Sequence, residues 1–293
     1  MAQQIQKRGL SPLISMVRPA NSVMVGFAVI VGMAVTSNSY QNIFTFTALL
    51  GFLTGFFISS FSMVSNDIYD LEVDRINQPN RPLPSQSVSI NQAKVFCWVL
   101  LVLGLLVSIR LGVVTFVIAG IFALIGWFYN YRGKAMGIFG NSLVALSLAI
   151  PYIYGSVALG NYSINLGYLL ALTSFLAGMG REVLKGVADV EGDRLRKIRT
   201  VAISYGIHSA RILSSAFFLI AVASSAFPIV LGLLGRALPV YLALITITDA
   251  IFVYLTYRVM SLRNEKDALK LKTIALGGMM FGLVAYLISG LAV

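Results

Sequence analysis

Residues 44–66 read FTFTALLGFLTGFFISSFSMVSN, and residues 67–75 continue as DIYDLEVDR. The first stretch carries no charge and is long enough to cross the hydrocarbon layer of a membrane, which takes roughly 20 residues in an α-helix. The second stretch contains four acids and one Arg. The change from one to the other predicts a membrane-spanning helix that ends in an acidic segment at one membrane surface.

Apolar runs of similar length recur along almost the whole chain. Of the 293 residues, 58% are hydrophobic and 11% are charged, whereas soluble domains carry about 25% charged residues. This composition predicts an all-α integral membrane protein with about nine transmembrane helices, forming a single polytopic domain over residues 1–293. The expected spans are 21–38, 44–66, 94–110, 112–130, 140–158, 165–186, 210–232, 238–258 and 271–291.

Positive charge is concentrated on one side of this topology. Of the 22 Lys and Arg residues, all but Arg110 and Arg236 fall in the N-terminal segment or in connections on the same side. Because basic residues favour the cytoplasmic side, we expect a multi-pass protein of the cell membrane with a cytoplasmic N-terminus and an external C-terminus. The net charge of +11 then requires no nucleic-acid partner, since orientation and attraction to anionic membrane lipids account for much of it.

The single cysteine and the single histidine exclude a disulfide within the chain, a cysteine metal site and a zinc site. Cys97 is the single cysteine and lies in a predicted span, so no disulfide forms within the chain and no cysteine metal site is available. His208 is the single histidine, and zinc sites need more partners. Asp249 lies near the middle of the eighth predicted span, where we expect it to pair with another buried polar group.

The acids after the second predicted span form the first of two clusters. If this helix continues beyond the membrane surface, Asn66, Asp70 and Asp74 stack on one face because they are spaced four residues apart. A proline-rich run, residues 77–85, follows and contains Arg81. The spacing predicts one wall of oxygen ligands.

The second cluster follows the sixth predicted span and repeats this spacing. Asp189 and Asp193 are four residues apart, and Glu182 and Lys185 precede them by one to two turns. Both clusters lie at C-terminal ends of helices, where the macrodipole is already negative, and like charges four residues apart repel each other. A bound cation is therefore expected, and carboxylate and amide oxygens without Cys or His favour Mg²⁺. The predicted metal ligands are Asn66, Asp70, Asp74, Asp189 and Asp193.

A simpler interpretation is that the acids only neutralise nearby Arg and Lys residues in solvated loops. Matching spacing in two clusters on the same side of the membrane favours a binding site instead. Neighbouring basic residues would then stabilise the charge of a departing diphosphate whose apolar tail lies among the helices. The pattern thus indicates an isoprenyl diphosphate ligand. Candidate phosphate-binding residues are Arg81, Arg132, Lys134, Arg181, Lys185 and Arg199.

At both clusters the sequence resembles the UbiA superfamily of intramembrane prenyltransferases. Residues 66–74 (NDIYDLEVD) and 80–85 (NRPLPS) are similar to the first motif of that family. Residues 189–194 (DVEGDR) with Thr200 are similar to its second motif, and residues 129–134 (YNYRGK) resemble its connection between the fourth and fifth helices. The resemblance covers essentially the whole chain and implies nine transmembrane helices around a central cavity.

The resemblance also implies roles for individual residues. Asn66 and Asp70 would hold one Mg²⁺ and Asp189 and Asp193 another, with the diphosphate of the donor bound by both ions. Asp70, Asp189 and Lys185 are then the predicted catalytic residues, and ionisation of the donor gives an allylic carbocation that the acceptor captures. From their charge and place in the chain, the predicted substrate-binding residues are Arg81, Arg132, Lys134, Arg181 and Arg199, together with Tyr129. Tyr129, Tyr131 and Tyr69 are candidates for stabilising the cation through their ring faces, although Tyr at a membrane interface is more often an anchor.

Residues 181–193 most resemble members of the family that build archaeal ether lipids. This implies transfer of a geranylgeranyl group from its diphosphate to the glycerol hydroxyl of geranylgeranylglyceryl phosphate, a prenylated glycerol phosphate. Prenylation of an aromatic or chlorophyll-type acceptor is the alternative. A cation transporter is more remote, because transport sites lie near the bilayer midplane, where Asp249 is the only acid. The family usually has Gly where Gln86 and Lys197 stand, which affects the expected loop geometry more than metal binding.

Overall fold

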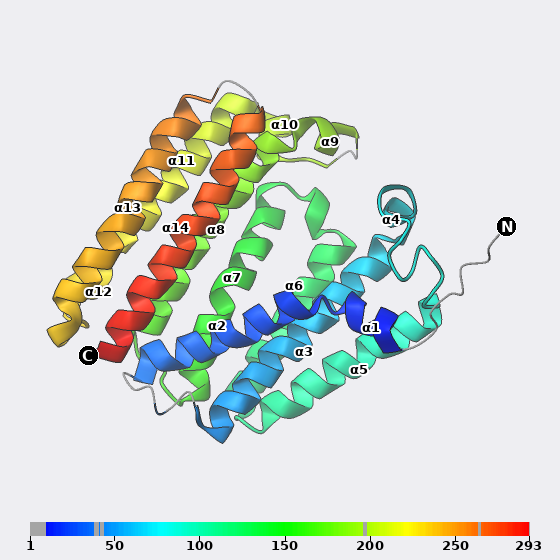
Figure 1. Ribbon diagram of the computed structural model, residues 1–293, viewed down its shortest axis with the longest axis horizontal. Coiled ribbons are helices and arrows are strands. Elements are labelled where there is room, and N and C mark those ends of the chain that lie inside the picture. Colours follow the sequence, from blue (N-terminus) through cyan, green and yellow to red (C-terminus); the bar gives the residue numbers. More distant parts are fainter. Residues whose placement is uncertain (1–9, 38–40, 42–43, 196–197, 263–264, 293) are drawn as a thin grey trace. The chain divides into compact units, whose positions relative to one another are not determined.

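All regular secondary structure in the described part of the chain is helical. The structure is a computed structural model, and it describes residues 10–37, 41, 44–195, 198–262 and 265–292 (Figure 1). The chain divides into two compact units, one comprising Met1–Ile30 and Phe46–Tyr131 and the other Val31–Thr45 and Arg132–Val293. Each unit is described by itself.

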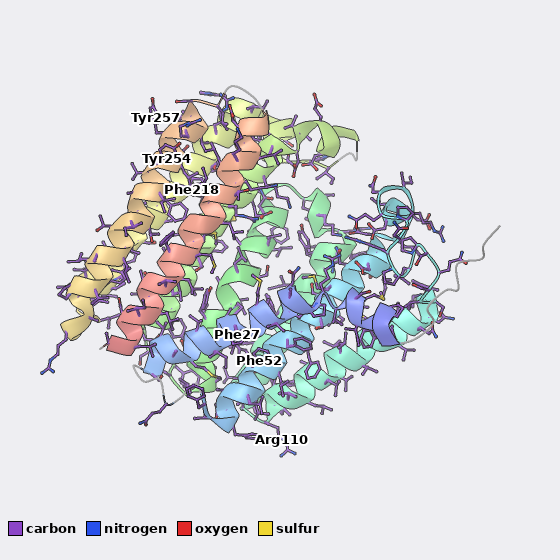
Figure 2. All side chains as sticks on the ribbon, viewed as in Figure 1. Phe27, Phe52, Arg110, Phe218, Tyr254 and Tyr257 are labelled. Atoms are coloured by element: carbon purple, nitrogen blue, oxygen red, sulfur yellow. The ribbon has the colours of Figure 1, made fainter. Side chains whose placement is uncertain are left out.

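The first unit is built around α3 (Phe46–Tyr69), the helix that the uncharged stretch predicts. Both α5 (Ile90–Ile109) and α6 (Val113–Tyr131) pack against it. In Figure 2, Phe27 lies beside Phe52 of α3, and the two rings meet edge to face with centroids 5.4 Å apart. The unit also contains α1 (Leu10–Met16), the first part of α2 (Pro19–Ser37), and α4 (Leu71–Asn77).

The second unit is arranged around α8 (Leu166–Ala188). This helix packs against α7 (Ile138–Ala158), α11 (Ile207–Ser224) and α14 (Glu265–Ala292). A further long helix, α13 (Leu238–Met260), lies beside α11 and α14 (Figure 1). The short elements of the unit are η2 (Gly133–Ala135), α9 (Val190–Leu195), α10 (Val201–Tyr205), α12 (Phe227–Val230) and η3 (Gly235–Ala237).

Close approach and buried hydroxyl groups hold the helices of the second unit together. Lipid tails are as apolar as the side chains, so hydrophobic burial does not drive helices together within a membrane. A Cβ atom on Gly180 of α8 would lie 2.7 Å from the Phe218 ring, so a larger residue would displace the ring. The Ser214 hydroxyl donates to the Gly180 carbonyl oxygen at 2.8 Å. A polar contact of this kind contributes on average about 0.6 kcal/mol inside a membrane.

Eight helices in the described residues are long and apolar enough to cross a membrane. They coincide with eight of the nine predicted spans. The predicted sixth span coincides with α8, which is equally long but carries Arg181, Glu182 and Lys185 near its C-terminal end. The expectation of about nine helices is therefore met by eight apolar helices and this more polar one. The last helix begins at Glu265, earlier than predicted, so Lys270 and Lys272 lie on its first turns.

Candidate active site

The helices α3 and α4 are joined at Asp70 with almost no break in the helical register. Asp70 adopts φ −90° and ψ 4°, and its N–H donates to the Asn66 carbonyl oxygen at 2.9 Å. The Asp74 N–H donates in turn to the Asp70 carbonyl oxygen at 2.8 Å. Because hydrogen bonds between residues four apart continue through this first acidic junction, Asn66, Asp70 and Asp74 lie on successive turns of one helix face, as their spacing predicts.

The helices α8 and α9 are joined in the same way at Asp189. This residue adopts φ −107° and ψ 13°, and its N–H donates to the Lys185 carbonyl oxygen at 3.0 Å. The Asp193 N–H donates to the Asp189 carbonyl oxygen at 2.8 Å. The second acidic junction therefore repeats the first, with one Asp at the end of a long helix and another one turn later.

Arg18, between α1 and α2, contacts the first acidic junction from outside the motif. Its Nη2 atom lies 2.7 Å from the Asp67 Oδ1 atom and 3.2 Å from the Asn66 Oδ1 atom. Arg18 has a φ of 47°, in the left-handed region that is unfavourable for L residues, and it precedes Pro19, which restricts it further. Such strain costs about 1–3 kcal/mol and persists only where the surroundings hold it. Here the bonds to Asp67 and Asn66 do so.

Arg81 neutralises the last acid of the first junction. Its Nη1 atom lies 2.6 Å from the Asp74 Oδ2 atom and 3.5 Å from the Asp67 Oδ1 atom. Both acids are buried, whereas the Arg81 side chain is 27% exposed and lines a polar hollow of about 560 Å³ together with Arg18. Asp74, predicted as a metal ligand, and Arg81, predicted to bind phosphate, are thus direct partners.

Asn130, near the end of α6, sets the orientation of Asn66. The Asn130 Nδ2 atom donates to the Ser62 carbonyl oxygen at 3.0 Å. Its Oδ1 atom therefore faces the other way and accepts from the Asn66 Nδ2 atom at 3.1 Å. The Asn66 Oδ1 atom is left pointing toward Arg18. An oxygen, which a metal ion needs, rather than an amino group is presented on that side of Asn66.

Glu182 is the partner of two predicted phosphate-binding residues. The Arg181 Nη1 atom lies 2.7 Å from one carboxylate oxygen of Glu182, and the Lys185 Nζ atom lies 3.6 Å from the other. The Glu182 side chain is buried, whereas that of Lys185 is 45% exposed. Because a partly exposed ion pair contributes only about 0–1 kcal/mol, Lys185 can turn to an anionic ligand at small cost.

The segment with Arg132 and Lys134 approaches the segment with Arg199. Gly137 adopts φ 58° and ψ −124°, a conformation that side chains disfavour, and a Cβ atom there would lie 2.6 Å from the Arg199 carbonyl oxygen. Arg132 precedes η2 and is exposed, Lys134 lies within η2 and is half-buried, and Arg199 is exposed. Three predicted phosphate-binding residues therefore belong to two segments in contact.

Three further positions named from the sequence are described by the structure: Tyr129, Gln86 and Asp249. Tyr129 is half-buried near the end of α6. Gln86 adopts a φ of 59°, so its position requires the left-handed backbone that glycine adopts most easily. The Ser225 hydroxyl donates to the Asp249 Oδ2 atom at 2.8 Å, which confirms the expected pairing of this half-buried acid with a buried polar group. Lys197 lies outside the described residues.

Each junction has donors that suit a hard cation. Among the described residues, no group of three or more His, Cys, Asp or Glu side chains is placed to hold a metal ion. Each junction alone offers two oxygen-bearing side chains one turn apart, Asn66 with Asp70 and Asp189 with Asp193. Magnesium usually takes only one or two carboxylates from a protein when phosphate oxygens and water complete its shell.

Residues 25–284 match the UbiA prenyltransferase family. The chain belongs to this family. It is therefore a prenyltransferase, and its apolar helices make it a multi-pass membrane protein. A digeranylgeranylglyceryl phosphate synthase from Methanococcus vannielii is 34% identical to it over 89% of this chain and 91% of the relative. A protein of the same name from Archaeoglobus fulgidus is 30% identical over 96% of this chain and 95% of the relative.

Solved structures agree with the UbiA assignment. One, described as giving insights into the biosynthesis of digeranylgeranylglyceryl phosphate synthase in membranes, matches with a TM-score of 0.87 and 30% identity over 97% of this chain and 99% of its own. A UbiA homologue from Archaeoglobus fulgidus bound to GPP and Mg²⁺ matches with a TM-score of 0.67 and 17% identity, over 96% of this chain and 100% of its own. The latter likeness shows a shared fold.

Proposed function

We propose that this UbiA-family chain is a digeranylgeranylglyceryl phosphate synthase. It would transfer a geranylgeranyl group from geranylgeranyl diphosphate to the glycerol hydroxyl of geranylgeranylglyceryl phosphate, forming the second ether bond of an archaeal-type membrane lipid. The observation that carries this proposal is the similarity, along nearly the whole chain, to relatives that bear this name. The family match extends through residues of both units, which supports one prenyltransferase domain over residues 1–293.

Magnesium is the proposed cofactor, held by Asn66 and Asp70 at the first junction and by Asp189 and Asp193 at the second. The all-oxygen donors, their four-residue spacing and their place at negative helix ends support this choice. The homologue that binds GPP and Mg²⁺ is consistent with it. Asp74 is the least available of the proposed ligands, because it is buried against Arg81.

The proposed reaction replaces one C–O bond by another. The bond between C1 of the prenyl chain and the diphosphate breaks, and its electron pair leaves with the diphosphate. The acceptor oxygen then forms the new bond to C1, and its hydroxyl proton passes to water or to the released diphosphate. Bound Mg²⁺ would neutralise the charge that grows on the leaving group, with Asp70 and Asp189 catalytic as its ligands.

The chain's basic residues would hold the anionic groups of the two substrates. In the second unit, Arg181 and Lys185 lie beside the acidic junction on Glu182, and Lys185 is proposed to stabilise the leaving diphosphate. Arg132, Lys134 and Arg199 are proposed to bind phosphate oxygens from the two apposed segments, and Tyr129 to face the prenyl cation. In the first unit, Arg81 lines the polar hollow with Arg18, which suits the phosphate of the acceptor.

The proposed orientation puts the N-terminus and both acidic junctions in the cytoplasm and the C-terminus outside. The skew of Lys and Arg residues supports this placement, because basic residues are retained on the cytoplasmic side. Single cysteines are placed near the N-terminus or near the C-terminus of the Cys97→Ser protein, and intact cells are treated with a membrane-impermeant maleimide. We expect only the C-terminal cysteine to be labelled. Labelling of the N-terminal cysteine alone would mean that the protein has the opposite orientation.

The proposed function is tested with purified protein, Mg²⁺ and labelled geranylgeranyl diphosphate. Geranylgeranylglyceryl phosphate and 4-hydroxybenzoate are offered side by side, and the product is identified by mass spectrometry. We expect an ether-linked glycerol phosphate with two prenyl chains, and no product after chelation of the metal. A prenylated aromatic product would move the chain to another branch of the UbiA family.

The metal ligands are tested by matched substitutions within each acidic cluster. Asp70→Asn and Asp189→Asn should each abolish product formation. The controls are Glu72→Gln and Glu191→Gln, since both acids are exposed and Glu72 pairs only with the exposed Arg75 among the described residues. These controls should retain most of the activity. Activity retained in both Asp variants would overturn the metal assignment.

A further inference from the structure

A groove on the first unit is distinct from the acidic junctions. It has a volume of about 600 Å³ and is formed by three stripes of side chains, one each from α3, α5 and α6. The stripe on α5 runs from Lys94 to Leu105, which corresponds to about 16 Å at the rise of an α-helix. This length is close to the depth of one leaflet's hydrocarbon layer, about 15 Å.

The walls of the groove are apolar, and the wall formed by α6 leaves space for an occupant. A Cβ atom added to Gly120 of α6 would meet no atom within 4 Å. Trp98 and Leu124 stand at the rim and are 65% and 64% exposed. A hollow that faces hydrocarbon is filled by hydrocarbon, because empty space forfeits the dispersion contacts of its lining. The shape therefore suits a single lipid chain.

The charged and amphipathic aromatic residues Lys94, Tyr69 and Trp127 lie at the end of the groove where α3 ends and α5 begins. The exposed Lys94 lies there, on the first turn and a half of α5. The Trp127 indole N–H donates to the Tyr69 hydroxyl at 2.9 Å at the same end. Amphipathic aromatic residues and a lysine are the side chains that meet lipid head groups at a membrane surface.

Ser65 adds an independent sign of a ligand. Ser65 lines the groove one turn before Tyr69, the residue is 3% exposed, and its buried Oγ atom has no hydrogen-bond partner among the described residues. Four residues of helix place Ser65 about 6 Å deeper than Tyr69, and the head-group layer of a bilayer is about 5–7 Å thick on each side. An unpaired buried hydroxyl is unfavourable, and at this depth the glycerol oxygens of a phospholipid would accept its hydrogen bond.

We propose that this groove is a binding site for a membrane phospholipid with an anionic head group. One chain of the lipid lies along α5 and α6, its glycerol oxygens face Ser65, and its phosphate faces Lys94. The lipid comes from the surrounding bilayer and is neither substrate of the transfer reaction. Charge decides which lipid binds, because a basic residue at the surface attracts an anionic head group more strongly than a zwitterionic one.

The chain carries its own reporters for this site. Its two tryptophans are Trp98 and Trp127, and both line the groove. The full chain is reconstituted in phosphatidylcholine vesicles that contain a minor fraction of phosphatidic acid. Bromine-labelled chains, which quench tryptophan fluorescence on contact, are placed on the phosphatidic acid in one series and on an equal fraction of the phosphatidylcholine in the other. We expect the anionic lipid to be preferred about fivefold, the effect of one basic residue near the surface.

Two substitutions with matched controls test the assignment. Lys94→Gln removes the charge and Gly120→Leu fills the groove, so each should bring the preference close to one. Lys270→Gln and Gly277→Leu on α14 are the controls, since Lys270 is likewise exposed and a Cβ atom on Gly277 likewise meets nothing within 4 Å. These should keep the preference. Equal quenching by both lipids in the unaltered protein, or a preference that survives both groove substitutions, would overturn the proposal. If the protein self-associates and neither brominated lipid then quenches the tryptophans, a second copy of the chain occupies the groove, and this too would overturn the proposal.

Discussion

The Asn130 Oδ1 atom accepts a hydrogen bond from the Asn66 Nδ2 atom at 3.1 Å, and this contact decides which end of the Asn66 amide faces Arg18. The Ser62 carbonyl oxygen can only accept, so the hydrogen bond that it receives at 3.0 Å fixes the Asn130 amide. Asn66 then has a single orientation that satisfies both amides. Asn130 is thus a positioning residue for a proposed metal ligand.

Asn130→Leu should raise the Mg²⁺ concentration needed for half-maximal activity by about 10–100-fold, the usual effect of losing a residue that orients a metal ligand. The measurement is a Mg²⁺ titration of prenyl transfer by purified protein.

A second substitution separates orientation from general damage. Asn66→Asp presents an oxygen whichever way its side chain turns, so adding Asn130→Leu to it should cause little further change in the Mg²⁺ requirement. If the two effects on the Mg²⁺ requirement simply add, Asn130 acts on stability or packing rather than through Asn66.

Asn130 also shows where prediction from sequence stops. The four-residue spacing within each cluster predicts where Asp70 and Asp189 lie on their helices, because helical periodicity is local. The hydrogen bonds through both junctions confirm these positions. The contact between Asn66 and Asn130 joins residues far apart in the chain, and nothing in the local pattern indicates it. In the sequence, Arg18 is one of the charges that orient the protein in the membrane, and nothing in the local pattern predicts its contacts with Asp67 and Asn66.

Arg81→Gln should lower both stability and activity, because it leaves Asp74 and Asp67 buried without this cation. Removing one partner of a buried ion pair costs about 3–5 kcal/mol, and the partial exposure of Arg81 reduces the expected loss to about 1–3 kcal/mol. The measurement is the midpoint of thermal unfolding in detergent, followed by the Michaelis constant for the acceptor.

Arg75→Gln is the matched control for Arg81. Its partner Glu72 is 79% exposed, and surface pairs of this kind are worth about 0–1 kcal/mol. We expect unfolding midpoints within error of the unaltered protein. Equal destabilisation by the two substitutions would mean that the burial of Asp74 and Asp67 does not matter.

Gln86→Gly should stabilise the protein. Gln86 has a φ of 59°, and an L residue in the left-handed region costs about 1–2 kcal/mol, whereas glycine adopts it freely at the cost of a more flexible unfolded chain. The net gain should be about 0.5–1 kcal/mol, seen as a higher unfolding midpoint. Gln78→Gly is the control, since Gln78 has a φ of −144° and carries no such strain. Glycine there should only make the unfolded chain more flexible and so lower the unfolding midpoint. Stabilisation by both changes would exclude relief of backbone strain as the cause.

Gly137→Ala should impair catalysis beyond its effect on stability. The substitution introduces a Cβ atom 2.6 Å from the Arg199 carbonyl oxygen at φ 58°, so the segments with Arg132, Lys134 and Arg199 must move apart. Displacing groups that bind a substrate by about 1 Å can cost a hundredfold in rate. Because these three residues are proposed to bind phosphate, we expect kcat/KM for the prenyl diphosphate to fall by about 10–100-fold. Gly160→Ala is the control, because Gly160 has a comparable φ of 72° but open space around its Cβ position. It should lower the unfolding midpoint and leave kcat/KM nearly unchanged. A similar loss of kcat/KM in both variants would show that backbone strain alone, and not the contact with Arg199, accounts for the effect.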